Sequence, residues 1–134
     1  MSSLSRRILS TFIVLAACWV FIIPKAIDSA PYGHITEMRL EATPNDWHGG
    51  CPVTINFHGF IRVDGPNTVI YAINRSDGGH GEGQQTLHFN GAGSRPVHFT
   101  WRLGSPGENF HGWAQIGSGN SRSDRAGFQI HCRK

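Results

Sequence analysis

The chain has 134 residues, of which 39% are hydrophobic and 16% are charged. This balance is typical of a globular protein, since disordered chains carry fewer apolar and more charged side chains. The pI of about 9.1 reflects the N-terminal segment, because from residue 31 onward the chain has nine basic and eight acidic residues. These charges are too few and too scattered for a phosphate-binding face, so we expect no nucleic-acid partner.

Residues 1–30 have the layout of an export signal. Arg6 and Arg7 precede a nearly continuous apolar run over residues 8–23, and a basic stretch followed by an apolar one is typical of secretory signals. Cleavage near residues 26–30 leaves a single domain over residues 31–134, and the protein is then secreted or periplasmic.

Two alternatives for this N-terminal segment remain open. The sequence Leu15-Ala16-Ala17-Cys18 resembles a bacterial lipobox, which predicts lipidation of Cys18. The apolar run also fits an uncleaved membrane-anchor helix, although it is short against the ~20 residues that cross a bilayer. Under every alternative the domain lies outside the cytoplasm.

The cysteine content agrees with export. Apart from Cys18, the chain contains two cysteines, Cys51 and Cys132. An even number of cysteines in a small exported domain predicts a disulfide. This bond closes a loop of about eighty residues, which corresponds to roughly 2 to 4 kcal/mol of stabilisation.

After residue 30 the hydrophobic pattern is that of β-strands, with no helical stripe. From Cys51 to Val63 the odd positions are apolar apart from Gly59, and most even positions are polar, which is the period of a half-buried strand. Segments rich in Gly, Asn, Asp and Ser separate the strands. We predict seven strands, at residues 34–42, 52–63, 68–75, 85–90, 96–104, 112–117 and 125–132.

Strands of this length and spacing predict an all-β sandwich or small barrel. If each strand reverses direction, the start of the second strand and the end of the seventh lie at the same end of the domain. Cys51 and Cys132 occupy these two positions. The strand arrangement and the predicted disulfide therefore support each other.

Several short motifs between Gly50 and Cys132 together resemble a family of exported bacterial immunoglobulin-like β-sandwich domains. The resemblance implies an immunoglobulin-like sandwich of about seven antiparallel strands, and it implies no activity and no catalytic residue. The motifs that carry it are Cys51-Pro52-Val53-Thr54-Ile55, Gly59-Phe60-Ile61, Gly65-Pro66, Thr68-Val69-Ile70-Tyr71, Arg75-Ser76-Asp77-Gly78, Thr100-Trp101-Arg102-Leu103-Gly104, Gly112-Trp113 and Ala126-Gly127-Phe128-Gln129-Ile130-His131-Cys132.

The chain contains eight histidines. His58, His88, His98 and His131 fall in the polar phase of their strands, so we expect them on the outer faces of the sandwich. If the first, second and fifth strands share a sheet, His58 and His98 face each other and form a weak candidate metal pair.

Three loops rich in polar residues are predicted to converge at the disulfide end. Loops at one end of a rigid sandwich are a common recognition surface. Asp46 belongs to the first of these loops and Arg75 to the second. The candidate ligand-binding residues are Trp47, His48, Asp77, His80, Glu82, Glu108 and His111.

Some of these residues also have a structural interpretation. Asp77 in Asp77-Gly78 suits a tight turn in which its carboxylate accepts backbone hydrogen bonds. Trp47 either covers the disulfide or stands exposed as a stacking surface. Trp101 and Trp113 lie among apolar positions, so both are expected in the core.

No catalytic motif is present: the chain has no G-x-S-x-G, no H-E-x-x-H, no P-loop and no C-x-x-C sequence. We therefore expect a non-enzymatic, extracytoplasmic binding module that needs no cofactor. Its expected partner is a cell-envelope protein or a glycan. The alternative is an exported Zn- or Cu-binding protein that uses His48, His80, Glu82, Glu108 and His111.

The intact mass of the protein exported by its own host tests these expectations together. Cleavage near residues 26–30 removes the mass of that segment, whereas lipidation leaves an acylated chain beginning at Cys18. Reduction should add the mass of two hydrogens if Cys51 and Cys132 are joined. An unprocessed mass that reduction does not change would contradict both predictions.

Overall fold

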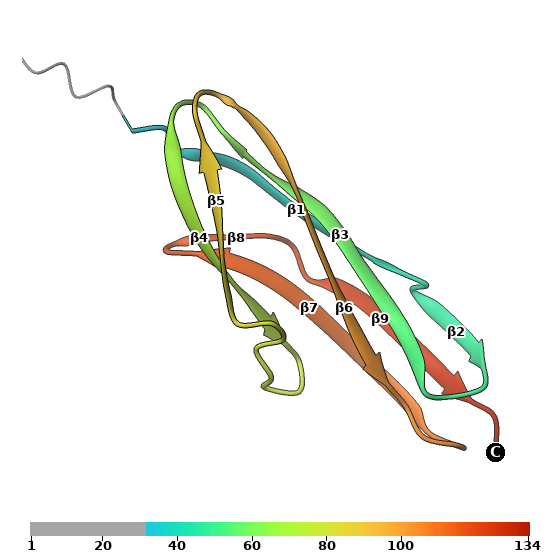
Figure 1. Cartoon of the computed structure of the whole chain (residues 1–134). Helices are drawn as coiled ribbons and strands as arrows, with labels where there is room; N and C mark the ends of the chain where they lie inside the picture. Colours follow the sequence, from blue (N-terminus) through green and yellow to red (C-terminus); the bar gives the residue numbers. More distant parts are fainter. Residues whose placement is uncertain (1–31) are drawn as a thin grey trace, which may run out of the picture.

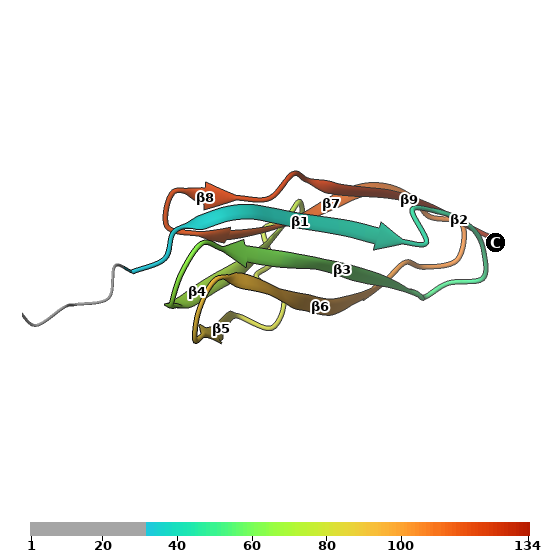
Figure 2. The same cartoon turned by 90° about the horizontal axis from the view of Figure 1, so that it is seen from above.

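The computed structural model describes residues 32–134. The predicted signal or anchor, the lipidation site at Cys18 and the domain boundary near residue 30 lie outside this range. The described part of the chain is all-β and forms two facing sheets (Figures 1 and 2). No helix in it has the length and hydrophobicity that a bilayer crossing requires.

The strands in chain order are β1 (Ile35–Thr43), β2 (Asp46–Gly49), β3 (Val53–Val63), β4 (Asn67–Arg75), β5 (Gln84–Phe89), β6 (Gly93–Leu103), β7 (Asn109–Ser118), β8 (Ser121–Arg122) and β9 (Ala126–Cys132). One sheet has the order β1-β3-β6, and the other has the order β2-β9-β7-β4-β5 with β8 paired to β7. All pairs are antiparallel except β2 with β9, which are parallel.

All seven predicted strands are present, with ends displaced by at most three residues. The condition under which His58 and His98 face each other is met, because β1, β3 and β6 share a sheet and His58 lies opposite His98 on β3 and β6. The count of seven antiparallel strands is wrong. The structure adds the parallel strand β2 and the strand β8, whose four and two residues are too short to show an alternating pattern.

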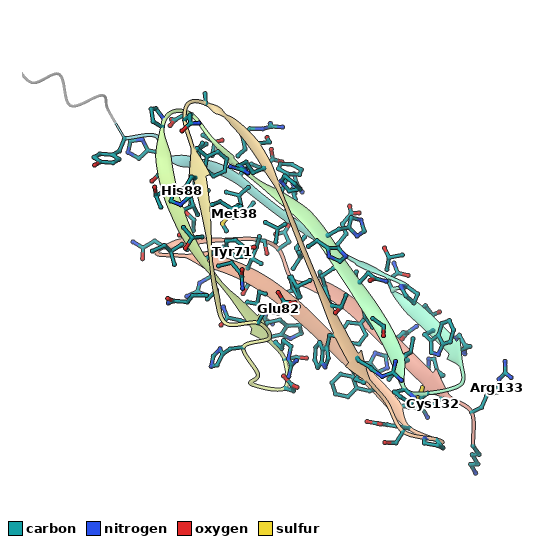
Figure 3. The ribbon with its side chains drawn as sticks, viewed as in Figure 1. Met38, Tyr71, Glu82, His88, Cys132 and Arg133 are labelled. Carbon is teal, nitrogen blue, oxygen red and sulfur yellow. A yellow bond between two sulfur atoms is a disulfide. The ribbon has the colours of Figure 1, made fainter. Side chains whose placement is uncertain are left out.

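The core forms where the inward positions of the two sheets meet. Along β3, residues Val53, Ile55 and Phe57 are buried while the residues between them are more exposed, as strand geometry requires. Met38 on β1 and Tyr71 on β4 point inward from opposite sheets (Figure 3). The alternation in the sequence therefore translates directly into two apolar faces packed against each other.

Aromatic rings fill the core toward the C-terminal end. Phe57 stacks on Phe99 within the first sheet at 4.9 Å between centroids and meets Phe128 of the second sheet edge-on at 5.8 Å. Trp101 contacts Phe110 and Phe128 in the same edge-to-face manner. Such contacts add about 0.5 to 1.5 kcal/mol per pair to the free energy of burial.

The predicted Cys51–Cys132 disulfide is present and joins the two sheets at this end. Cys51 leads into β3 of the first sheet, and Cys132 ends β9 of the second, with 5.5 Å between the Cα atoms. Gly104 passes next to the bond with φ of +103°, and a Cβ there would lie 3.0 Å from both sulfur atoms. The backbone turn beside the disulfide thus requires glycine.

Replacing both cysteines with alanine should lower the free energy of unfolding by about 2 to 4 kcal/mol, because the cross-link restricts the unfolded chain. Urea denaturation of Cys51→Ala/Cys132→Ala against the oxidised wild type measures this difference. Wild-type protein held reduced should match the variant. Equal midpoints for the oxidised wild type and the variant would contradict the prediction.

Candidate functional site

A polar surface lies at the disulfide end on the outer side of β2, β9 and β7; we call it the β2–β9–β7 face. Residues paired across β2, β9 and β7 form two rows on this face. The first row is His48, His131 and Asn109, and the second is Asp46, Gln129 and His111. The intervening residues of β9, such as Ile130, turn into the core. Because side chains alternate along a strand, all six polar side chains point away from the core.

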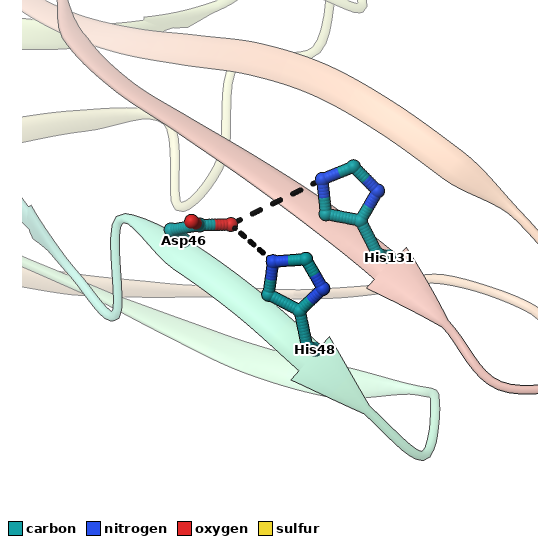
Figure 4. Close-up of side chains that lie close together, drawn as sticks. All are labelled: Asp46, His48 and His131. Carbon is teal, nitrogen blue, oxygen red and sulfur yellow. Dashed lines mark ion pairs between the residues drawn. The ribbon is translucent and has the colours of Figure 1, made fainter.

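The centre of this face is a cluster of Asp46, His48 and His131 (Figure 4). His48 Nε2 lies 3.1 Å and His131 Nε2 lies 4.0 Å from Asp46 Oδ1. The two imidazole rings are stacked, with centroids 4.3 Å apart and an interplanar angle of 13°. One nitrogen of each ring therefore faces the same carboxylate oxygen.

His131 is held from its other side by Asn109. Its Nδ1 lies 2.9 Å from Asn109 Oδ1, and the tautomer with the proton on Nδ1 donates to this amide oxygen, which only accepts hydrogen bonds. In that tautomer the Nε2 lone pair lies on the side of Asp46. His111 adds a third ring, edge-on to His131 with 6.5 Å between centroids.

An aromatic and a cationic side chain flank this cluster farther along β7 and β9. The Arg125 guanidinium lies 4.2 Å from the centroid of the Trp113 ring. The expectation that Trp113 is a core residue is wrong: Ala114 and Ile116 are buried, and Trp113 alternates with them on the outer side. Trp101, by contrast, lies in the core as predicted.

Of the candidate residues at this end, Trp47 and Glu108 have structural contacts. Trp47 packs partly against the core, and its indole N–H donates to the Gly50 carbonyl at 3.1 Å. Glu108 closes the β6–β7 turn by accepting from the Ser105 amide at 2.8 Å. The site at this end is therefore built around His48 and His111, together with Asp46, Asn109 and His131.

The expected convergence of a third loop is wrong. Arg75 at the end of β4 pairs with Ala114, and β7 extends five residues beyond that point to Asn109, a distance of about 17 Å. The β4–β5 loop with Asp77, His80 and Glu82 therefore lies beside the middle of β7, apart from β2 and the C-terminus (Figure 1).

Asp77 in this loop has the structural role that its turn sequence predicts. Its carboxylate accepts from Arg75 Nε at 3.0 Å and from the Gly79 amide at 2.9 Å, and Gly78 has a φ of +83°. Arg75 in turn covers the Trp101 ring at 4.4 Å. The motif thus closes the side of the core. Desolvation raises the pKa of Asp77, but the hydrogen bonds from Arg75 and Gly79 lower it by more. The pKa of Asp77 therefore lies below its ordinary value.

Glu82 and His80 are exposed, and each bonds through its main chain within this loop. Glu82 lies near Tyr71: burial raises the pKa of Tyr71, and the negative charge of Glu82 raises it further. Glu82 is labelled beside the middle of the domain in Figure 3, away from Cys132. His80 and Glu82 are therefore not part of the β2–β9–β7 face.

The opposite sheet has an outer depression of about 550 Å³ whose lining includes His58, His98 and Phe60. Its charged groups pair with one another: Glu37 accepts from Arg39 at 2.8 Å and lies 3.1 Å from Arg62. The hydrogen bond from Arg39 and the positive charge of Arg62 hold the pKa of Glu37 below its ordinary value, against partial desolvation, which raises it. A shallower depression, about 470 Å³, lies beside Asp46 and His111.

Sequence reasoning placed Asn109 with Glu108 and His111 in a loop at this end, but it did not predict that His131 belongs to the site. The polar phase of β9 correctly predicts an outward His131, and its i−2 neighbour Gln129 follows the same rule. What brings His48 beside His131 is the parallel pairing of β2 with β9. A strand of four residues gives no signal for that pairing.

Neither a family model nor a curated protein sequence matches the chain. Its fold is similar to part of a β-glucosidase from Erythrobacter marinus, with a TM-score of 0.57, 10% identity, and coverage of 73% of this chain and 15% of that one. The fold is also similar to part of a β-glucosidase from Listeria innocua in complex with glucose, with a TM-score of 0.55 and 10% identity. This likeness covers 76% of this chain and 16% of that one. The chain thus spans about one sixth of these enzymes' length, and the likeness shows an all-β two-sheet fold alone.

Replacing Asp77 with alanine should lower the free energy of unfolding by about 0.5 to 1 kcal/mol at neutral pH, because Arg75 and the Gly79 amide lose a partly exposed charged acceptor. A carboxylate with a lowered folded pKa stabilises above its unfolded pKa, near 3.8, and loses this effect as pH falls through the folded value. The difference between wild type and Asp77→Ala should therefore shrink below about pH 4.

Chemical denaturation at pH 7, 5 and 3 measures this change. Asp77→Asn is the matched control, since its amide oxygen can still accept from the Gly79 amide but carries no charge. We expect Asp77→Asn to have a lower free energy of unfolding than the wild type at pH 7. This free energy should also change less than that of the wild type as the pH falls. A difference between wild type and alanine variant that stays constant down to pH 3 would contradict the ionic role of Asp77.

Proposed function

We propose that the chain is an exported, non-enzymatic binding module with an immunoglobulin-like fold. We propose further that it recognises a component of the cell envelope, a protein or a glycan, through the β2–β9–β7 face. The observation that carries this proposal is the display of six polar side chains in two cross-strand rows on a sheet fixed by a disulfide. Rigid scaffolds that present such groups need little ordering on binding.

The order of strands supports the immunoglobulin-like assignment. In immunoglobulin lettering, β1, β3 and β6 take the places of strands A, B and E, and β9, β7 and β4 take those of G, F and C. The disulfide differs from the usual link between strands B and F, because it joins the start of β3 to the end of β9. The fold likeness reported above is compatible with this assignment but does not name a family.

Hydrogen bonding in the histidine cluster supports a binding role over a catalytic one. Nucleophilic catalysis needs a hydroxyl or thiol within hydrogen-bond distance of a base. Among residues 32–134, His48 and His131 lie against Asp46, Asn109 and each other, and neither hydrogen-bonds a hydroxyl or thiol. The cluster therefore offers recognition groups without a nucleophile.

The position of the face also suits a module that acts at a membrane surface. Strand β1 begins at the end of the sandwich opposite to the C-terminus (Figure 1), whereas Cys132 of the disulfide lies near the C-terminus (Figure 3). If the N-terminal segment is retained as an anchor or lipidated, the β2–β9–β7 face would lie on the half of the domain farther from the bilayer. A soluble exported form would leave the same face accessible.

Binding of the purified domain to the envelope fraction of its host, measured as a saturation isotherm, tests the proposal. Trp113→Ala/Arg125→Ala and His111→Ala should each weaken binding at least tenfold, because aromatic and Arg side chains commonly contribute most to recognition. Trp47 is unsuitable as a probe, since it packs against the core.

The matched control is Phe60→Ala/Arg62→Ala, which removes an aromatic–Arg pair of 5.4 Å from the outer face of the other sheet. We expect this variant to bind like the wild type. If only the control variant loses binding, the recognition surface lies on the β1-β3-β6 sheet instead. Absence of saturable binding by the wild type would refute the envelope-binding function itself.

A further inference from the structure

We infer that Asp46, His48 and His131 form a binding site for one divalent transition-metal ion of the Zn²⁺ or Cu²⁺ type. Their candidate ligand atoms all lie within 4.8 Å of one another. The set differs from the one expected from the sequence, because the β4–β5 loop with His80 and Glu82 lies elsewhere and Glu108 closes a turn. The inference stands apart from the proposed envelope binding, since it concerns an ion alone.

The spacing of the three side chains is close to that of a metal site. Zn²⁺ binds imidazole nitrogen and carboxylate oxygen at about 2.0 to 2.2 Å in a tetrahedron, which sets neighbouring ligand atoms about 3.4 Å apart. Asp46 Oδ1 lies 3.1 Å from His48 Nε2 and 4.0 Å from His131 Nε2. Ligation thus requires shifts of about 1 Å or less for these pairs.

The site can make this adjustment without moving the backbone. The His48 side chain is 67% exposed and that of Asp46 is 48% exposed, so both can rotate freely. The planes of the two rings are nearly parallel, and rotation of the exposed His48 side chain would direct its lone pair toward the common centre. The parallel strands β2 and β9 keep the Cα positions in register during this change.

Asn109 prepares His131 for the ion. In the tautomer in which His131 Nδ1 donates to Asn109 Oδ1 at 2.9 Å, the Nε2 atom keeps its lone pair on the metal side. A polar partner on the second ring nitrogen is the usual support of a metal-binding histidine. Asn109 is therefore a positioning residue, and His131, 35% exposed, is the most constrained of the three ligands.

The donor set also selects the class of ion. Two imidazoles and one carboxylate suit Zn²⁺, Cu²⁺ and Ni²⁺, whereas Ca²⁺ and Mg²⁺ prefer sites made of oxygen alone. Three protein ligands leave a fourth position for water. The resulting site is open to solvent, since the side chains of His48 and Asp46 are 67% and 48% exposed.

The other sheet provides a natural comparison with the same residue types. His58 faces His98, and Glu41 lies 3.5 Å from His58 Nε2. Yet within residues 32–134 the Asp46 cluster is the one group of three or more such side chains that could hold an ion. Both groups contain two histidines and a carboxylate, but only in the Asp46 cluster do the candidate ligand atoms lie close enough together to hold one ion.

Calorimetric titration of the untagged, oxidised protein with ZnCl₂ tests the inference. The wild type should bind one ion at its strongest site. His48→Ala, His131→Ala and Asp46→Asn should each lower the affinity for Zn²⁺ at least tenfold. Asn109→Ala should lower it about tenfold, because the His131 ring is then no longer held in its orientation. The control His58→Ala/His98→Ala should stay within twofold of the wild type, and CaCl₂ should give no comparable binding.

A second measurement needs no variant. In a ¹⁵N-labelled wild type, substoichiometric Cu²⁺ should broaden first the amide resonances of residues 46–49 and 129–132. The inference is overturned if His48→Ala/His131→Ala binds Zn²⁺ within twofold of the wild type, if the control pair loses as much affinity, or if broadening centres on residues 58 and 98. Because no envelope fraction is used, these results are independent of the envelope-binding test.

Discussion

The pairing of β2 with β9 is the constraint on which the candidate site depends. The two strands are parallel, with Gly49 opposite Cys132, and the Arg133 amide donates to the Gly49 carbonyl at 2.8 Å. A strand of four residues pairs weakly by itself, but Cys51 follows it by two positions and is bonded to Cys132. The disulfide therefore keeps a short edge strand beside β9, and this contact brings His48 to His131.

The same bond connects the site to the core. Inward of the outer histidines, Trp101 of the first sheet meets Phe110 and Phe128 of the second sheet edge-to-face, and these two phenylalanine rings are tilted against each other. Ile130 is fully buried between His131 and Gln129 along β9. Each strand of the face thus has an apolar side that fixes its position and a polar side that faces outward. The strands themselves therefore hold the outward groups in place.

The polar motifs of the chain divide into two kinds in the structure. Arg75-Ser76-Asp77-Gly78 and Glu108 use their polar groups within turns, where Asp77 pairs with Arg75 and Glu108 accepts from the Ser105 amide. Asp46, His48, His111 and His131 instead retain solvent-facing donors and acceptors. Turn chemistry explains the first kind, because those side chains hydrogen-bond main-chain groups a few residues away. The second kind depends on residues distant in the sequence.

The sequence by itself determined the all-β class of fold, the positions of seven strands, the inward and outward sides of most of their residues and the pairing of the cysteines, because side-chain alternation and an even cysteine count are local signals. It also placed His131 on the outer side of its strand. Only the tertiary structure decided that Trp113 lies on the surface, that the β4–β5 loop lies apart, and that Asp46, His48 and His131 converge. The physical reason is that strand alternation tells which side a residue faces, whereas the neighbour it meets there is set by long-range register between β2, β9 and β7.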